Sequence, residues 1–230
     1  FLLEKEVQDV GSYFSIIKTI ASGKEKPSEI AAALEIKSTN LPKYLNVLID
    51  LDILEREVPA TESNPEKSKM GLYKIKDNYI KFWFKFIYPY RSYIETDHLA
   101  FVSDKIRDGF IKNHVAFVYE DICRTEFMND LVTKNTWSFI PQKIGRWWDR
   151  KDTEIDIVAV DESSKSIIFG ECKYTTKETD VSLYYELLEK IKKVDWNKDT
   201  RNEYFVFFSI NGYTEKFKEL AEKNKNIILV

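Results

Sequence analysis

Apolar residues recur at helical spacing in three segments near the start of the chain. Their period of about 3.6 predicts short amphipathic helices over residues 13–21, 28–34 and 41–51. Gly23 follows the first segment and Pro27 opens the second, and both residues are typical of helix boundaries. The N-terminal part is therefore expected to begin with three short helices.

Two β-prone segments follow these helices. Residues 53–58 and 70–75 predict two strands, and the polar stretch from Pro59 to Lys69 joins them. Three helices followed by a hairpin with a long polar tip is the order of elements in a winged helix-turn-helix. We therefore predict a winged helix-turn-helix domain over residues 1–78.

Aromatic residues at helical spacing mark the next segment. Residues 79–90 carry them, and we expect this stripe to pack in a core, inside a helical linker over residues 79–102 that joins two domains. A second helical segment is predicted over residues 103–127.

The pattern changes to β-prone runs after Asn135. Helices are predicted over residues 181–194 and 214–224, and strands over residues 136–140, 153–160, 166–174, 203–210 and 226–230. The order of helix, three strands, helix, strand, helix, strand predicts an α/β domain with a mixed sheet over residues 103–230. The predicted fold class is therefore mixed α/β, with the winged helix-turn-helix placed first.

Composition excludes several classes of function. The net charge of −3 over 230 residues excludes a polybasic coat, and two cysteines and two histidines exclude a disulfide scaffold, a four-cysteine zinc site and a histidine-rich metal site. Because no signal peptide is visible and no apolar run reaches the roughly 20 residues of a membrane span, we expect a cytoplasmic protein without a membrane partner.

Charged side chains interrupt two of the predicted strands. Asp156 lies in an otherwise apolar strand, and Glu171 and Lys173 lie two positions apart on the next, so both point to one face. A turn centred on residues 163–164 would place Asp156 opposite Glu171. The hairpin alone thus predicts two carboxylates and an ammonium at one place.

Two interpretations of this cluster stay open. Two carboxylates repel each other, and a divalent cation such as Mg²⁺ or Mn²⁺ relieves the repulsion and can activate a water beside a phosphodiester. The lysine would then orient that water or stabilise the transition state. The alternative is an ion cluster that only stabilises the sheet.

The motifs on these strands resemble a known nuclease pattern. Asp156 followed by Glu171-Cys172-Lys173, after a helix that carries Glu120, resembles the PD-(D/E)xK nucleases. The strings GRWWD, EIDIVA and GECK, together with the winged-helix-like region, are more specifically similar to the C-terminal part of the archaeal DEXX-box ATPase family. This resemblance covers nearly the whole chain, although no Pro-Asp pair precedes the strand.

The resemblance implies a restriction-endonuclease-like domain and a set of roles. Asp156 and Glu171 would be metal ligands for Mg²⁺ or Mn²⁺, Lys173 would be the catalytic lysine, and Glu120 would complete the catalytic site. It also implies an N-terminal P-loop ATPase domain. The chain contains no GxxxxGK(S/T) motif and begins with Phe1 rather than Met, so we expect the ATPase to lie upstream.

Other polar and basic residues are candidates for DNA binding. Thr39, Asn40 and Lys43 fall at the start of the third predicted helix, Lys69 falls in the predicted wing, and Arg146 and Arg150 flank two tryptophans. The alternatives are that the winged helix binds protein, that the tryptophans pack in the core, and that both arginines pair with Asp149 or Asp152.

Three functions follow from the sequence, the last of which is a purely structural assembly domain of the ATPase. The first is metal-dependent hydrolysis of DNA by an endonuclease-like enzyme. The second is a non-catalytic module that binds DNA or protein beside an ATPase. Homo-oligomerisation stays open.

Overall fold

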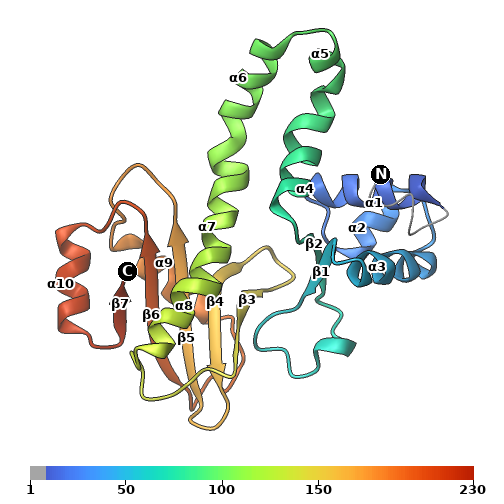
Figure 1. Ribbon diagram of the computed structural model, residues 1–230. Coiled ribbons are helices and arrows are strands. Elements are labelled where there is room, and N and C mark those ends of the chain that lie inside the picture. Colours follow the sequence, from blue (N-terminus) through green and yellow to red (C-terminus); the bar gives the residue numbers. More distant parts are fainter. Residues whose placement is uncertain (1–8) are drawn as a thin grey trace. The chain divides into compact units, whose positions relative to one another are not determined.

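The computed structural model describes residues 9–230, which divide into two compact units (Figure 1). One unit contains the chain up to Glu57 together with Lys69–Ile111, and the other contains Val58–Ser68 together with Lys112–Val230. The chain therefore passes between the units three times. The first eight residues of the predicted N-terminal domain lie outside the described part, and the predicted domain boundaries stay predictions.

The first unit begins with three helices and a two-stranded antiparallel sheet, in the predicted order. The helices are α1 (Val10–Ala21), α2 (Pro27–Ala33) and α3 (Leu41–Asp50), with a 3₁₀ turn at Ser38–Asn40, and the strands are β1 (Leu54–Glu57) and β2 (Leu72–Ile75). The apolar stripes of the helices meet in one core, in which Ile16, Ile30 and Leu45 are almost fully buried. Asp9 caps α1 by accepting a hydrogen bond from the backbone N–H of Ser12.

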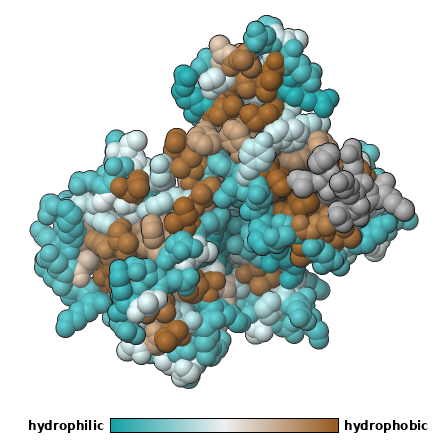
Figure 2. Space-filling view, in the orientation of Figure 1, coloured by the Kyte–Doolittle hydropathy of each residue, from teal (hydrophilic) through white to brown (hydrophobic). Residues whose placement is uncertain are grey.

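The aromatic segment is helical but is not a continuous core stripe. It consists of α4 (Asn78–Phe82), a π-helical turn at Trp83–Ile87, a 3₁₀ turn at Tyr88–Tyr90 and α5 (Arg91–Glu95), followed by α6 (Leu99–Phe110). Phe86 is buried, whereas Tyr79 is 72% exposed, so the expectation of a buried stripe is wrong for part of it. The π and 3₁₀ turns change the number of residues per turn and rotate the aromatic positions off one face. Figure 2 shows hydrophobic residues at the surface around the connection from α5 to α6, where Tyr93, Leu99 and Phe101 are exposed.

The second unit is built on a mixed five-stranded sheet, which confirms the predicted fold class. The strand order is β3-β4-β5-β6-β7, with β3, β4 and β5 antiparallel and β5, β6 and β7 parallel. The strands are β3 (Lys143–Trp148), β4 (Glu154–Asp161), β5 (Ser166–Lys173), β6 (Asn202–Ser209) and β7 (Ile227–Leu229), and the helices are α7 (Ala116–Ile122), α8 (Met128–Thr133), α9 (Ser182–Ile191) and α10 (Glu215–Lys223). Two further π-helical turns, at Ile111–Val115 and Cys123–Phe127, flank α7.

Helices cover both faces of this sheet. Tyr119 and Met128, from the α7–α8 segment, pack against one face, and Leu187 of α9 and Phe217 of α10 pack against the other (Figure 1). β6 runs between the two layers, which explains its nearly continuous apolar sequence.

The first strand of this unit does not lie where the sequence predicts it. Residues 136–140 form no strand, and β3 lies at Lys143–Trp148 instead. Asn135 ends the preceding helix with a left-handed φ of 55°, and Pro141 cannot donate a backbone hydrogen bond to a ladder. Trp137 and Phe139 nevertheless pack against the sheet as irregular chain, which accounts for the apolar pattern that suggested a strand.

The polar segment between β1 and β2 belongs to the second unit. We call residues 58–68 the strap; they include a 3₁₀ turn at Pro65–Lys67. The Ala60 N–H donates to the Arg146 carbonyl at 2.8 Å, the Lys143 ammonium donates to the Glu62 carbonyl at 3.0 Å, and Ala60 joins the core of the unit. The start of the predicted wing tip, at Ala60 and Glu62, is thus packed on β3, whereas residues 63–67 are exposed.

Within residues 9–230, none of the helices combines the length and the apolar composition that crossing a bilayer requires.

Candidate active site

Asp156 occupies an irregular point of the sheet. β3 and β4 pair regularly except where the single residue Arg146 lies opposite two residues, Asp156 and Ile157. This is the geometry of a β-bulge, which redirects a side chain away from the regular alternation of a strand. The bulge therefore determines where the Asp156 carboxylate points.

The predicted hairpin register is confirmed by the ladder between β4 and β5. Ile157 pairs with Gly170, and the regular ladder ends there, so Asp156 and Glu171 are the next positions on the two strands. The Asp156 carboxylate accepts a hydrogen bond from the Cys172 N–H at 2.9 Å, and the Arg124 guanidinium donates to the Asp156 carbonyl at 2.7 Å. The Asp156 side chain and backbone are thus both held by neighbours.

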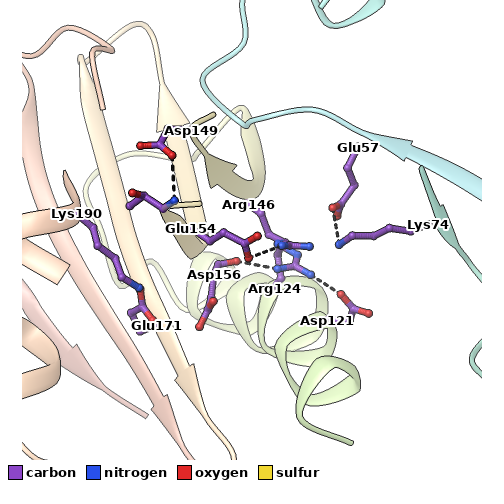
Figure 3. A network of polar contacts seen from close by, with 11 residues as sticks. Glu57, Lys74, Asp121, Arg124, Arg146, Asp149, Glu154, Asp156, Glu171 and Lys190 are labelled. Atoms are coloured by element: carbon purple, nitrogen blue, oxygen red, sulfur yellow. Dashed lines mark hydrogen bonds and ion pairs between the residues drawn. The ribbon is translucent and has the colours of Figure 1, made fainter. Parts of the chain in front are cut away.

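Glu171 is almost completely buried and lies between two ammonium groups. Its side chain is 1% exposed; the Lys190 Nζ lies 2.6 Å from Oε1 and the Lys173 Nζ lies 3.4 Å from Oε2. Figure 3 shows Lys190 reaching Glu171 on one side while Asp156 lies on the other. Because an unpaired buried carboxylate is costly, these two cations allow Glu171 to be buried.

Electrostatic coupling joins Glu120 of α7 to this pair. Burial and the Asp156 charge raise the pKa of Glu120 to about 7, against the opposing effect of Arg146 and Arg124. Burial and Asp156 likewise raise the pKa of Glu171 to about 7, against Lys190 and Lys173.

The pKa of Lys173 is shifted by the same carboxylates. Burial by itself would lower the pKa of Lys173, but the carboxylates of Glu171, Asp156 and Glu120 outweigh burial and raise it. The structure therefore brings together the four residues that the sequence singles out for catalysis.

We predict that stability without added metal falls as the pH rises from about 5 to 7. Because the pKa of Glu120 and Glu171 is raised in the folded state, the folded chain binds more protons than the unfolded chain in this window. Each group contributes a loss of at most about 1.4 kcal/mol per pH unit. Urea unfolding in EDTA at several pH values measures the slope.

Glu120→Gln should make this slope shallower, and the same change at the exposed Glu222 should not. An unchanged slope in Glu120→Gln would contradict the prediction.

A second prediction concerns Lys190. Lys190→Met should lower the free energy of unfolding by about 1–2 kcal/mol, because a buried carboxylate loses a charged hydrogen-bond donor while Lys173 remains. Lys192→Met, at the residue that follows α9, is the matched control. Both side chains of its ion pair with Glu189 are about two-thirds exposed, so this pair should contribute less than about 0.5 kcal/mol. Equal losses of unfolding free energy in the two variants would show that the buried Lys190–Glu171 pair contributes no more to stability than an exposed ion pair.

The residues predicted to bind DNA differ in how exposed they are and in which side chains they contact. Arg146 is buried and pairs with Glu154 at 2.9 Å, an acid that the sequence did not suggest as its partner. The register of β3 and β4 explains this, because Glu154 lies on the neighbouring strand. The ammonium of exposed Lys43 lies 4.6 Å from the Tyr44 ring. The other predicted residues are exposed, namely Thr39, Asn40, Lys69 and Arg150.

The two tryptophans and the cysteine near the site lie in the core. Trp147 and Trp148 are buried, as the packing alternative expected. Cys172 points to the opposite face from Glu171 and lies in the core beside Cys123. Its hydrogen bond with Cys123 and its burial hold the pKa of the Cys172 thiol far above the usual range, so this thiol stays protonated and is unsuited to act as a nucleophile.

The donor set fits magnesium only in part. Mg²⁺ is commonly held by one or two carboxylates together with water and substrate phosphate, and Asp156 and Glu171 supply two. Across residues 9–230, however, no group of three or more acidic, histidine or cysteine side chains is close enough to hold a metal, and both Glu171 oxygens face ammonium groups. Glu120 is therefore coupled to the pair without forming a three-carboxylate cage.

Sequence reasoning missed two residues of this site, Lys190 and Arg124. The available signal for Lys190 was its place next to Ile191 and three residues after Leu187, on the edge of the buried face of α9. The ion pair of Arg124 with Asp121 lies within one helical turn, but its bond to the Asp156 carbonyl spans 32 residues. No local pattern indicates that second contact.

Comparisons with known proteins place the chain among uncharacterised relatives. Residues 83–184 match a protein family described as DUF234, archaeal and bacterial proteins of unknown function. The chain is 35% identical over 221 residues to an uncharacterized protein of Methanocaldococcus jannaschii, an alignment that covers 95% of the chain and 48% of the relative. The chain thus spans about half the length of that relative. No solved structure matches it significantly.

Proposed function

We propose that the second unit is a metal-dependent phosphodiester hydrolase acting on DNA. The observation that supports this proposal is the bulged Asp156 beside the Glu171–Lys173 pair at the end of one hairpin. Asp156 and Glu171 would hold Mg²⁺ or Mn²⁺. When bound, the metal would polarise the phosphodiester and lower the pKa of a water.

The remaining groups supply positioning and proton transfer. The partly exposed Lys173 ammonium is suited to orient the attacking water or to neutralise charge on the phosphate oxygens. The Glu120 carboxyl, with its pKa raised to about 7, is able to accept a proton from water near neutral pH. Arg124 positions Asp156 through the backbone carbonyl. We also propose that the chain works with a P-loop ATPase domain, in line with the family resemblance in its motifs.

A cleavage assay tests the hydrolase. The whole chain is incubated with linear DNA and Mg²⁺ or Mn²⁺, with and without EDTA, beside Asp156→Ala. Asp152→Ala is the control, because Asp152 is an exposed acid in the β3–β4 loop. Metal-dependent cleavage that Asp156→Ala abolishes and Asp152→Ala retains would support the proposal. No cleavage in any condition, or cleavage that Asp156→Ala leaves unaltered, would refute it.

One observation favours a second function, a non-catalytic binding module. The two Glu171 oxygens already face Lys190 and Lys173, so this carboxylate is satisfied without a metal. Such a module would bind DNA or protein equally well with EDTA, and Lys173→Ala would leave binding unchanged. Metal-dependent cleavage of DNA would exclude this second function.

A further inference from the structure

A cavity of about 600 Å³ in the first unit gathers three cations from three separate helical segments. Lys18 comes from the last turn of α1, Lys85 from the π-helical turn at Trp83–Ile87, and Arg91 from the start of α5. The hydroxyl-bearing residues Ser22 and Ser92 also line it, and none of the lining residues in the described chain is acidic. Its size lies within the range of small-molecule sites, roughly 300–1,000 Å³.

An aromatic ring positions two of these cations. The Lys18 ammonium and the Arg91 guanidinium each lie 5.3 Å from the centre of the Tyr88 ring. The ring is itself fixed by Phe14 at 5.1 Å and Trp83 at 5.3 Å between ring centres. A cation–π contact orients a cation without neutralising its charge, so both cations keep their charge for a ligand.

The third cation is partly withdrawn from water. Burial lowers the pKa of Lys85 and so does the neighbouring charge of Lys81, while Glu25 acts in the opposite direction. Placing the partly buried Lys85 at the same cavity as the exposed cations Lys18 and Arg91 costs free energy, and an anion in the cavity would offset that cost.

We propose that this cavity, lined by Lys18, Lys85 and Arg91, binds a phosphate group, carried either by a free polyphosphate-bearing molecule or by a nucleic-acid backbone. Arginine and lysine together are the usual partners of phosphate, and a planar guanidinium can form two parallel hydrogen bonds with it. The cavity is larger than one phosphate needs, so the ligand has room for a further group. The inference concerns the first unit and does not depend on the proposed hydrolase.

The test uses the whole chain and two probes, inorganic tripolyphosphate and a labelled single-stranded oligonucleotide. Calorimetry measures binding of the first and fluorescence anisotropy binding of the second. The double variant Lys18→Gln, Arg91→Gln should weaken binding of at least one probe by tenfold or more. For the oligonucleotide it should also reduce the slope of log affinity against log salt by about 0.7 for each lost phosphate contact. Both altered residues are exposed, so folding should be preserved, and an unchanged melting temperature checks it.

The matched control is Lys105→Gln, Arg107→Gln on α6. Lys105 also lies over an aromatic ring and Arg107 is exposed, so this variant removes the same charge from the same unit. It should change affinity by less than twofold. Loss of tripolyphosphate binding alone would identify a free phosphate-bearing ligand, and loss of oligonucleotide binding would identify a nucleic-acid backbone. Absence of binding of both probes, or equal losses in the two double variants, would overturn the proposal.

Discussion

Lys173→Ala is expected to reduce the proposed metal-dependent DNA cleavage by about 10²–10³-fold, because it would remove a preorganised charge from the place where negative charge would develop on the phosphate. The Lys173 side chain is about one-third exposed and is attracted by three carboxylates, so its ammonium is both positioned and accessible. Single-turnover cleavage with saturating Mg²⁺ measures the chemical step directly.

Lys198→Ala provides the comparison for this loss. Lys198 is exposed and precedes β6, whose start at Asn202 pairs with Ser166, whereas Lys173 lies at the other end of the same ladder. Its loss should change the rate by less than twofold. If Lys173→Ala cleaves as fast as the unaltered chain, the ammonium has no part in the chemistry and the hydrolase assignment loses its catalytic lysine.

Gly170→Ala is expected to lower the free energy of unfolding by about 3 kcal/mol, since it overpacks a close-packed sheet. A Cβ at this position would lie 2.8 Å from Val206 Cγ1, 2.9 Å from the Val206 carbonyl oxygen and 3.1 Å from Ile157 Cβ. Two of these contacts involve β6 on one side and the third involves β4 on the other, so the strand cannot move away from all of them. Denaturant unfolding measures the loss.

At Gly11, by contrast, a substitution by alanine creates no close contact. Gly11 lies in α1, where the nearest atom to an added Cβ is an Asp9 carboxylate oxygen at 4.0 Å, and the change should stabilise the chain by about 0.5–1 kcal/mol. Should Gly170→Ala prove as stable as the parent chain, the close packing of β4, β5 and β6 at this point would be disproved.

Local spacing was sufficient to predict the hairpin but not its surroundings. The short polar turn determines the β4–β5 register, and alternation along β5 determines that Glu171 and Lys173 share a face. The β3 strand was missed because its two adjacent buried tryptophans do not alternate, as expected beside a bulge. Lys190 reaches Glu171 only through the packing of α9 on the sheet, which no pattern within either segment contains.

The same limit applies to the predicted wing. Its polar composition predicted the long tip of a hairpin, yet a backbone hydrogen bond from Ala60 and the buried Ala60 side chain join it to β3. A contact that involves only two residues hardly changes the hydropathy pattern of the segment, so the pattern does not predict it.

The strap also limits how the chain can be divided into fragments. A fragment that starts after Ile111 would contain the whole five-stranded sheet but would lack the strap, and so the Arg146 carbonyl would lose its Ala60 partner beside the bulge that positions Asp156. A fragment that ends at Ile111 would keep the strap but not the strand that it pairs with. Gene truncations at a single point are therefore poor tools for this chain, and a split protein would need both pieces present to restore the contact between the strap and β3.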